Sequence, residues 1–338
     1  MPIRLKDLAA ELNLSVTTVS RALADYDDVS PRTRQRVRQA AEAMGYVPDI
    51  TAQRLQGQRK NALGFIIPTF GPRFSDPFFS EILAGIGNET GRQGYDLLIS
   101  TVAPGPQELE VYHRYVFGRR VDGLLAVRTR RQDQRLAFLI ENNFPVVAFG
   151  RTELPLSFPW IDVDGAHGLH LVVDHLVQLG HRRIAYARPP EELMFDAERW
   201  RGFEDALAHY GVPIVADLIR HGDLTQASGF RLGGDLLDLA EPPTAVISGN
   251  DLMALGVMAA AQGRGMEVGR DLSVIGFDDV TSSEHAHPPL TTVRQPIYHI
   301  GELVAEMLIQ IINGEAPEET GILLEPKLIV RDSSGQPL

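Results

Sequence analysis

Apolar residues recur at helical spacing three times within the first 46 positions. The segment LKDLAAEL has them at positions 5, 8, 9 and 12, which is one face of a helix. A second helix is predicted from Ser15, a residue suited to an N-cap, and its inward side chains are predicted to be Val16, Val19 and Leu23. A third is predicted with Ser30 as its N-cap and Pro31 at its first position, and it ends at Gly45.

After position 61 the pattern changes to short apolar runs that alternate with helical segments. Strands are predicted at 62–68, 95–101, 123–127, 145–150, 160–164, 183–187, 218–221, 245–250 and 273–279. Helices are predicted at 78–92, 107–117, 133–141, 165–179, 197–210, 225–240 and 251–263. This order predicts parallel β-α-β units in two doubly wound lobes, with ligands at the carboxyl ends of the strands. Two such lobes facing each other form a cleft that closes by hinge motion.

Composition places the chain among soluble, multi-domain proteins. Its 338 residues suggest two or three compact units, and 44% hydrophobic with 22% charged content is ordinary for a globular protein. The absence of cysteine excludes disulfide and thiolate chemistry. The start MPIRLKDLAAEL does not resemble a signal peptide, and no apolar run is long enough for a membrane span. A cytoplasmic protein without a membrane partner is therefore expected.

Charge is unevenly distributed along the chain. Residues 1–60 hold ten Lys and Arg against seven Asp and Glu, whereas the remainder holds 22 basic and 37 acidic residues. A basic head suggests contact with a polyanion. Two short helices joined by a tight turn at Asn13, with a third packed across them, predict a helix-turn-helix unit that reads DNA. The alternative from these residues is a small helical cap with a solvated polar face.

Two stretches of this head, LKDLAAELNLSVTTVSRAL and VSPRTRQRVRQAAEAMGYVPD, resemble the DNA-binding head of the LacI/GalR family of bacterial repressors. The resemblance implies that Val16, Thr17 and Arg21 read bases and that other residues position the DNA backbone. Arg4 and Asp49 depart from the family, which usually has Thr and Asn there. The complete set of expected DNA contacts is Leu5, Ser15, Val16, Thr17, Thr18, Arg21, Ser30, Thr33, Tyr46, Ala52 and Leu55.

The segment 49–61 corresponds by this resemblance to a hinge helix that forms when two subunits occupy an operator. Leu55 matches the family's minor-groove leucine, and Ala52 matches its small neighbour. The physics is consistent, because an isolated helix this short is marginal in water and an apolar wedge can kink DNA. Taken without the resemblance, the segment is better interpreted as a plain flexible linker.

Polar and aromatic residues near the strand ends provide a candidate ligand site. Carboxylates, amides and a guanidinium can bind sugar hydroxyls, and an aromatic face can cover the ring. Any one of these residues could instead cap a helix or fill the core. Blocks such as ERWRGFEDAL, GNDLMALGVM and LSVIGFDDV resemble the family in order, which implies effector contacts at Arg199, Asn250 and Asp278. The expected set is Asp76, Phe78, Phe79, Arg151, Trp160, Phe195, Arg199, Leu224, Asn250, Asp278 and Gln295.

The sequence therefore predicts an all-α helix-turn-helix head (1–48), a hinge or linker (49–61), and a two-lobed body of periplasmic-binding-protein type (62–330) with a tail (331–338). The lobes are expected at about 62–161 with 295–322, and at 162–294 with 323–330. The expected function is a sugar-controlled, homodimeric repressor that binds a near-palindromic operator, without catalytic residues, metal or cofactor. Its effector is expected to be a glucoside or similar saccharide, stacked on Trp160 or Phe195. The alternatives are a sugar-binding protein and a sugar kinase carrying a DNA-binding head.

Overall fold

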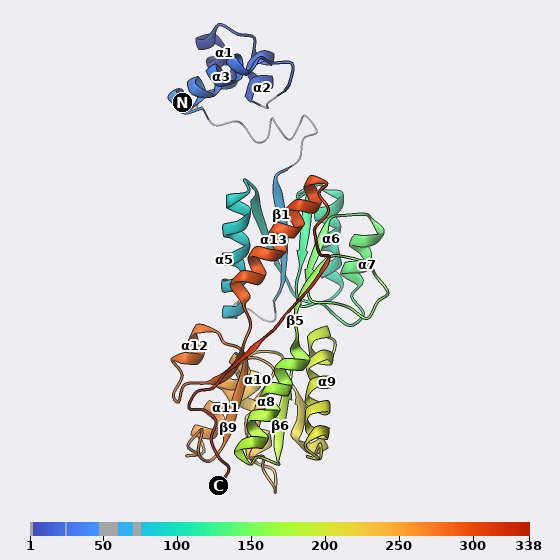
Figure 1. Cartoon of the computed structure of the whole chain (residues 1–338), viewed down its shortest axis with the longest axis vertical. Coiled ribbons are helices and arrows are strands. Elements are labelled where there is room, and N and C mark those ends of the chain that lie inside the picture. Colours follow the sequence, from blue (N-terminus) through green and yellow to red (C-terminus); the bar gives the residue numbers. More distant parts are fainter. Residues whose placement is uncertain (1–2, 24–25, 47–59, 70–75) are drawn as a thin grey trace. The chain divides into compact units, whose positions relative to one another are not determined.

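The computed structural model describes residues 3–23, 26–46, 60–69 and 76–338. The chain forms two compact units, Met1–Lys60 and Asn61–Leu338 (Figure 1). The expected hinge helix, with Ala52 and Leu55, lies outside the described residues.

The first unit is a three-helix domain made of α1 (Leu5–Leu12), α2 (Val16–Leu23) and α3 (Pro31–Met44). Asn13 ends α1 in the left-handed conformation, with φ of 51°, which its short polar side chain tolerates. This tight turn lets α1 and α2 pack on α3 around one small core. The buried apolar residues of that core are Leu8, Ala9, Leu12, Val19, Ala22, Val29, Val37 and Ala41.

The predicted caps of the head are confirmed. The Ser15 hydroxyl accepts a hydrogen bond from the Thr18 amide at 3.0 Å, and the Ser30 hydroxyl accepts one from the Thr33 amide at 3.2 Å. The inward orientation predicted for Val16 is wrong, because this side chain is 47% exposed. The prediction is confirmed for Val19, which is buried, and for Leu23, which packs against the core; Ala22, three residues after Val19, is buried as well.

The second unit contains two lobes, each built on a six-stranded sheet (Figure 1). The sheet of lobe 1 has the order β11-β5-β4-β3-β1-β2, and all its strand pairs are parallel. Its strands are β1 (Ala62–Pro68), β2 (Asp96–Val102), β3 (Gly123–Ala126), β4 (Val146–Phe149), β5 (Trp160–Val163) and β11 (Gly321–Leu324). Its helices are α5 (Pro77–Arg92), α6 (Pro106–Phe117), α7 (Gln134–Glu141) and α13 (Ile297–Asn313).

Lobe 2 repeats this architecture with the order β12-β10-β9-β8-β6-β7. Only its β10–β12 pair is antiparallel. Its strands are β6 (Ile184–Arg188), β7 (Ile219–His221), β8 (Ala245–Ser248), β9 (Ser273–Asp278), β10 (Thr291–Arg294) and β12 (Lys327–Ile329). Its helices are α8 (Gly165–Leu179), α9 (Met194–His209), α10 (Gln226–Leu237), α11 (Asp251–Gln262) and α12 (Thr281–Glu284), with the short 3₁₀ helix η1 (Ala216–Leu218).

The chain crosses between the lobes three times: from β5 to α8, from β10 to α13, and from β11 to β12. Consequently both sheets end on a strand contributed by the last 20 residues. The C-terminal segment also packs on lobe 2, where the Ser333 hydroxyl accepts from the Thr291 amide at 2.8 Å and donates to the Val274 carbonyl at 2.6 Å.

The predicted fold class is confirmed, with differences at the element boundaries. Helix α9 begins at Met194 rather than near 197, and α10 ends at Leu237 rather than near 240. No elements were predicted after position 279, where α12, β10, α13, β11 and β12 lie. Across the described ranges, no helix is both long and apolar enough to cross a membrane.

Helices α5 and α13 approach each other closely through glycine. A Cβ atom at Gly85 would collide with the Tyr298 carbonyl oxygen, and one at Gly301 would collide with the Ile82 carbonyl oxygen. Two helix backbones can come this near only where one side has no side chain. By contrast, a Cβ atom at Gly87, on the same helix, would meet no atom within 4 Å.

We expect Gly85→Ala to lower the free energy of unfolding by about 1–3 kcal/mol, because the added methyl group overpacks the α5–α13 contact. Gly87→Ala is the matched control and should leave stability unchanged or raise it by up to about 1 kcal/mol, because alanine is the better helix former. Urea unfolding of both variants measures the difference. Equal effects of the two substitutions would contradict the close packing.

Candidate functional site

The exposed face of the head gathers several of the residues expected to contact DNA. A shallow depression over α1 and α2 is lined by Leu5, Val16, Thr17, Ser20, Arg21 and Tyr26. Ser20 and Tyr26 were not predicted. Ser15 and Thr18 lie at the start of α2, Ser30 and Thr33 at the start of α3, and Tyr46 follows its C-cap.

Arg21 is held in a defined position on this face. Its guanidinium lies 2.6 Å from the Asp28 carboxylate and 5.0 Å from the centre of the Tyr26 ring. Both charged side chains are about half exposed, at 45% and 53%, so this ion pair adds little stability. A guanine edge with two hydrogen-bond acceptors could take the place of the Asp28 carboxylate. The Arg21 guanidinium would then remain paired when DNA excludes water from it.

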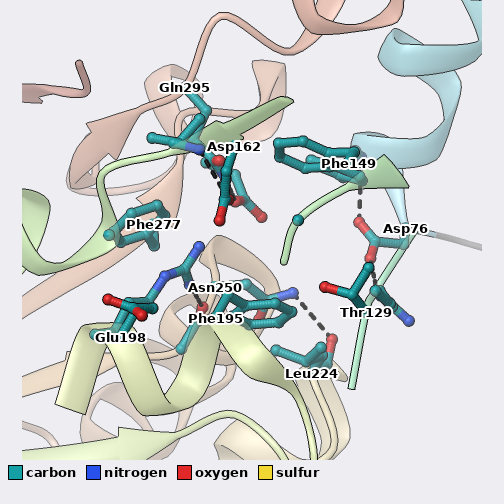
Figure 2. Close-up of a pocket in the computed structure, with 18 residues that line it drawn as sticks. Asp76, Thr129, Phe149, Asp162, Phe195, Glu198, Leu224, Asn250, Phe277 and Gln295 are labelled. Carbon is teal, nitrogen blue, oxygen red and sulfur yellow. Dashed lines mark hydrogen bonds and ion pairs between the residues drawn. The ribbon is translucent and has the colours of Figure 1, made fainter. Parts of the chain in front are cut away.

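A cleft lies between the two lobes at the carboxyl ends of their strands (Figure 2). It contains about 710 Å³ of empty space, part of it open to solvent, within the usual range for small-molecule sites. The expected effector residues that line it are Asp76, Phe78, Phe195, Arg199, Leu224, Asn250, Asp278 and Gln295. The residues that also line it, outside the expected set, are Arg128, Thr129, Phe149, Gly150, Asp162, Val163, Gly165, Glu198, Gly249 and Phe277.

Arg199, on α9, is the central cation of the cleft. Its guanidinium carbon lies 3.4 Å from the centre of the Phe277 ring and 4.6 Å from that of Phe195. One terminal nitrogen donates to the Gly249 carbonyl at 2.8 Å, whereas the buried Nε has no hydrogen-bond partner. Burial lowers the pKa of Arg199, and Asp278 opposes that shift. A buried donor without an acceptor is costly, and an oxygen of a ligand would satisfy it.

Asp278 ends β9 with a backbone φ of 123°, a strained value for a residue with a side chain. Its carboxyl accepts a 2.6 Å hydrogen bond from Gln295. Burial and the neighbouring Asp251 raise the pKa of Asp278 well above its usual value, although Arg199 lowers it. Asp251 is itself buried, and that burial raises its pKa to about 6. The Asp278 carboxyl can therefore both donate to and accept from a ligand hydroxyl.

The lobe 1 side of the cleft carries two carboxylates that each face an arginine. Asp76 caps α5 and pairs with Arg128 at 2.5 Å. Asp162 pairs with Arg151 at 2.8 Å. Burial raises the pKa of both Asp76 and Asp162, and the arginines oppose that rise. The charge of each of these two carboxylates in the cleft is therefore balanced by its arginine partner.

Aromatic rings cover both sides of the cleft. Phe78 and Phe149 of lobe 1 stack with their centroids 6.0 Å apart, and Phe195 and Phe277 of lobe 2 flank Arg199 (Figure 2). Asn250 caps α11 and donates from Nδ2 to the Leu224 carbonyl at 3.1 Å. Because the side-chain oxygen of Asn250 accepts the capping hydrogen bond of α11, both ends of this amide already have a partner in the protein.

The remaining expected effector residues lie outside this lining. Phe79 is 1% exposed in the lobe 1 core, below the Arg128 guanidinium. Trp160 lies 5.4 Å from the guanidinium carbon of Arg151, which bridges towards Glu198 of lobe 2 at 3.8 Å. Arg151 and Trp160 thus lie behind Asp162 and do not line the cleft themselves.

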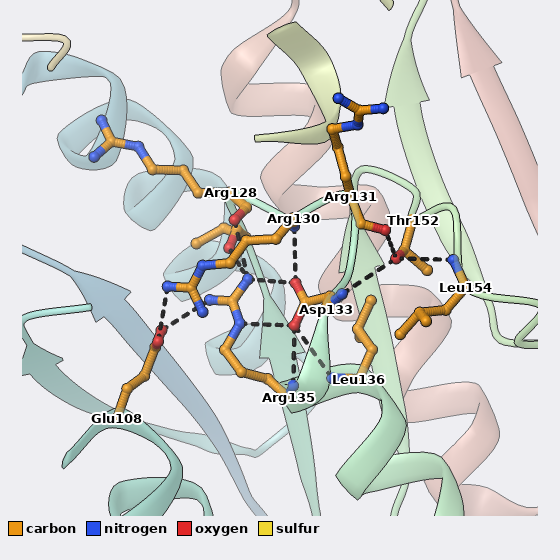
Figure 3. Close-up of polar contacts among 10 residues, drawn as sticks. Glu108, Arg128, Arg130, Arg131, Asp133, Arg135, Leu136, Thr152 and Leu154 are labelled. Carbon is orange, nitrogen blue, oxygen red and sulfur yellow. Dashed lines mark hydrogen bonds and ion pairs between the residues drawn. The ribbon is translucent and has the colours of Figure 1, made fainter. Parts of the chain in front are cut away.

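A buried polar network fixes the loop that carries Arg128 and Thr129 (Figure 3). The fully buried Arg135 donates to Asp133 at 2.6 Å, to Glu108 at 3.0 Å and to the Arg128 carbonyl at 3.0 Å. Asp133 in turn accepts from the Arg130 amide at 2.9 Å. A buried network in which each charge is paired rigidifies its surroundings.

Comparison with known proteins relates both parts of the chain to bacterial regulators. Residues 4–49 match the family described as bacterial regulatory proteins, lacI family, and residues 173–334 match the periplasmic binding protein-like domain. The HTH-type transcriptional regulator CelR of Thermobifida fusca is 33% identical over 335 residues, which cover 97% of each chain.

Two solved structures resemble the whole chain. The transcriptional regulator CelR–cellobiose complex has a TM-score of 0.76 and 32% identity, covering 98% of this chain and 99% of that one. The lac repressor dimer bound to operator and the anti-inducer ONPF has a TM-score of 0.84 and 29% identity, covering 99% and 100%.

Asp278→Asn should become more stable relative to the parent protein as pH rises above about 4. The pKa of Asp278 is higher in the folded state than its unfolded value near 3.9, so the parent loses free energy of unfolding as pH rises from the unfolded towards the folded pKa. Asparagine does not titrate, so the variant lacks this contribution to the pH dependence of stability. Thermal unfolding of both proteins across this range measures the difference.

Asp271→Asn is the control for this experiment. The partly buried Asp271 has a pKa lowered by its hydrogen bond from Arg270, so its contribution changes only at lower pH. Its difference from the parent should be constant between about pH 5 and 8. A constant difference for Asp278→Asn as well would contradict the raised pKa.

Proposed function

This chain belongs to the lacI family of bacterial regulatory proteins, and we propose that it is a repressor of carbohydrate-utilisation genes controlled by a small saccharide. The observation that carries this proposal is the cleft built around Arg199, whose buried Nε lacks an acceptor between two aromatic rings. The same chain carries a helix-turn-helix head with an exposed reading face.

The head reads a near-palindromic operator as part of a homodimer. Short polar side chains at the start of α2, such as Thr17, let the helix approach the bases, and Arg21 makes a bidentate contact with guanine. The hydroxyls at the start of α3 bind a phosphate. Two-fold symmetry of the protein then supplies two reading helices to two half-sites.

The ligand is an uncharged saccharide. Its oxygens accept from Arg199, its hydroxyls bind the Asp278 carboxyl, and its ring lies against phenylalanine. The carboxyl groups of Asp162, Glu198 and Asp278 line the same space and offer hydrogen-bond partners to further hydroxyls of the ligand. The solved relative CelR binds cellobiose, which supports a glucoside in particular.

The two sites are coupled through the lobes. Saccharide binding closes the cleft and shifts the first lobes of the dimer against each other, which changes the spacing of the two heads. Typical coupling of this kind amounts to about 1–3 kcal/mol. No enzymatic activity is part of this proposal: a sugar kinase needs a nucleotide-binding loop, and the sequence contains no G-x-x-x-x-G-K-[ST] motif.

Arg21→Ala should weaken operator binding by about 1–3 kcal/mol and relax the preference at one base pair of each half-site, because it removes a bidentate base contact. Gel retardation against an operator and its single-base variants measures both effects. Arg32→Ala, a charge-matched change on α3, should instead weaken all sequences alike. If Arg21→Ala showed the same uniform loss, Arg21 would not be a base reader.

A thermal-shift screen with disaccharides, nucleosides and sugar phosphates tests the ligand class. An uncharged saccharide at 100 times its Kd should stabilise the protein by about 2.7 kcal/mol. Asp278→Ala should abolish this response and leave DNA affinity without ligand intact, whereas Glu204→Ala, an exposed change on α9, should preserve both. Stabilisation by nucleosides or sugar phosphates alone would overturn the saccharide assignment.

A further inference from the structure

Two backbone hydrogen bonds join the lobes beside the cleft. The Met194 amide of lobe 2 donates to the Thr129 carbonyl of lobe 1, and the Arg131 amide of lobe 1 donates to the Glu192 carbonyl of lobe 2, both at 2.9 Å. Arg130 and Leu193 lie between them in an antiparallel β-bridge. The loop after β3 is thereby paired with the loop after β6, across the boundary that opens when the lobes separate.

The lobe 1 side of this contact is held rigidly. Arg135 donates to the Arg128 carbonyl, and Asp133 accepts from the Arg130 amide, so the residues on both sides of Thr129 are anchored (Figure 3). The Arg131 carbonyl accepts from the Thr152 hydroxyl at 2.8 Å and from the Glu153 amide at 2.9 Å. Thr129 therefore presents its carbonyl from a loop with little freedom to follow lobe 2.

The lobe 2 side is the start of a helix that lines the cleft. Met194 is the first residue of α9, and the preceding Leu193 provides no side-chain cap. The first amides of a helix have no acceptor within that helix. Here Thr129 supplies the acceptor from the other lobe. The same helix carries Phe195 and Arg199 into the cleft.

We propose that Thr129 caps α9 across the cleft, and that this backbone latch positions Phe195 and Arg199 for the effector. When the lobes close, the Met194 amide exchanges water for the Thr129 carbonyl, and α9 is fixed relative to lobe 1. When they open, the bond is lost and α9 moves away with lobe 2. The role in effector binding rests on the proposed function; the effect of the latch on lobe closure does not.

Met194→Pro deletes the donor of the latch with little disturbance of the helix. Proline has no amide hydrogen and fits the first position of a helix, and Leu193 is already extended, with φ of −78° and ψ of 135°, as a residue before proline requires. Met194→Ala keeps the amide and truncates the side chain. Gln226→Pro places proline at the first position of α10, also in lobe 2, away from the latch.

Lobe closure can be measured without any ligand, because the chain has no cysteine of its own. Spin labels at Glu141→Cys on α7 and Glu204→Cys on α9 report the distance between the lobes by electron double resonance in the full-length protein. We expect Met194→Pro to raise the ratio of open to closed molecules roughly two- to tenfold. Met194→Ala and Gln226→Pro should match the parent. An unchanged distribution in Met194→Pro, or an equal change in Gln226→Pro, would overturn the latch.

Hydrogen exchange of the unmodified protein keeps the test decisive should Met194→Pro fail to fold. Residue-resolved exchange should show the Met194 amide protected relative to the Gln226 amide, which is also first in its helix. Equal rates would refute the cross-lobe cap.

Binding of cellobiose by calorimetry then tests the effector role separately. A roughly two- to tenfold loss of affinity in Met194→Pro alone supports it. An unchanged affinity alongside altered closure would refute the positioning of Phe195 and Arg199 while leaving the latch intact. If the parent protein binds no saccharide, the proposed function fails, and the closure measurement still decides the latch.

Discussion

The burial of the Arg199 guanidinium between two aromatic rings is the interaction on which the cleft depends. A charge removed from water needs compensation, and within the described part of the chain Arg199 has no carboxylate at ion-pair distance. The Gly249 carbonyl and the face of Phe277 supply part of it. Gly165 is required behind it, because a Cβ atom there would lie 2.9 Å from Cγ of Arg199. The cleft is consequently built around an unsatisfied donor, while Asp76 and Asp162 are each neutralised by an arginine of lobe 1.

Much of the architecture follows from local sequence signals. Alternating apolar runs and helical segments identify the two parallel sheets, and the serines before α2 and α3 identify where those helices begin. Helix α13 has a clear apolar face and could have been predicted from it. Strands β10, β11 and β12 have only three or four residues each. Other strands this short were identified by their alternation with helices, whereas no helix separates β11 from β12 and only the four-residue α12 separates β9 from β10. Val16 was misjudged because the first turn of a short helix need not contact the core.

Cleft residues that directly follow a strand could be predicted from the sequence. Cleft residues in other positions were harder to predict. Phe78 and Phe79 are adjacent on α5, and a helix turns about 100° per residue, so only Phe78 faces the cleft. Trp160 stands at the amino end of β5, whereas the cleft meets the carboxyl end, where Asp162 and Val163 lie. The contributions of Thr129, on the loop after β3, and of Glu198, on α9, depend on how the two lobes meet, which no local pattern encodes.

The late position of β11 and β12 affects how the protein is made on the ribosome. Each strand forms the outer edge of its sheet, and Ser333 then supplies the acceptor for the Thr291 amide. Until β11 and β12 have been synthesised, β5 and β10 remain uncovered edges that can pair with foreign strands. The three-helix head has no such requirement, because its core is complete within the first 46 residues. A nascent chain can therefore fold its head long before either lobe, and the body is most exposed to aggregation in the interval before β11 and β12 emerge.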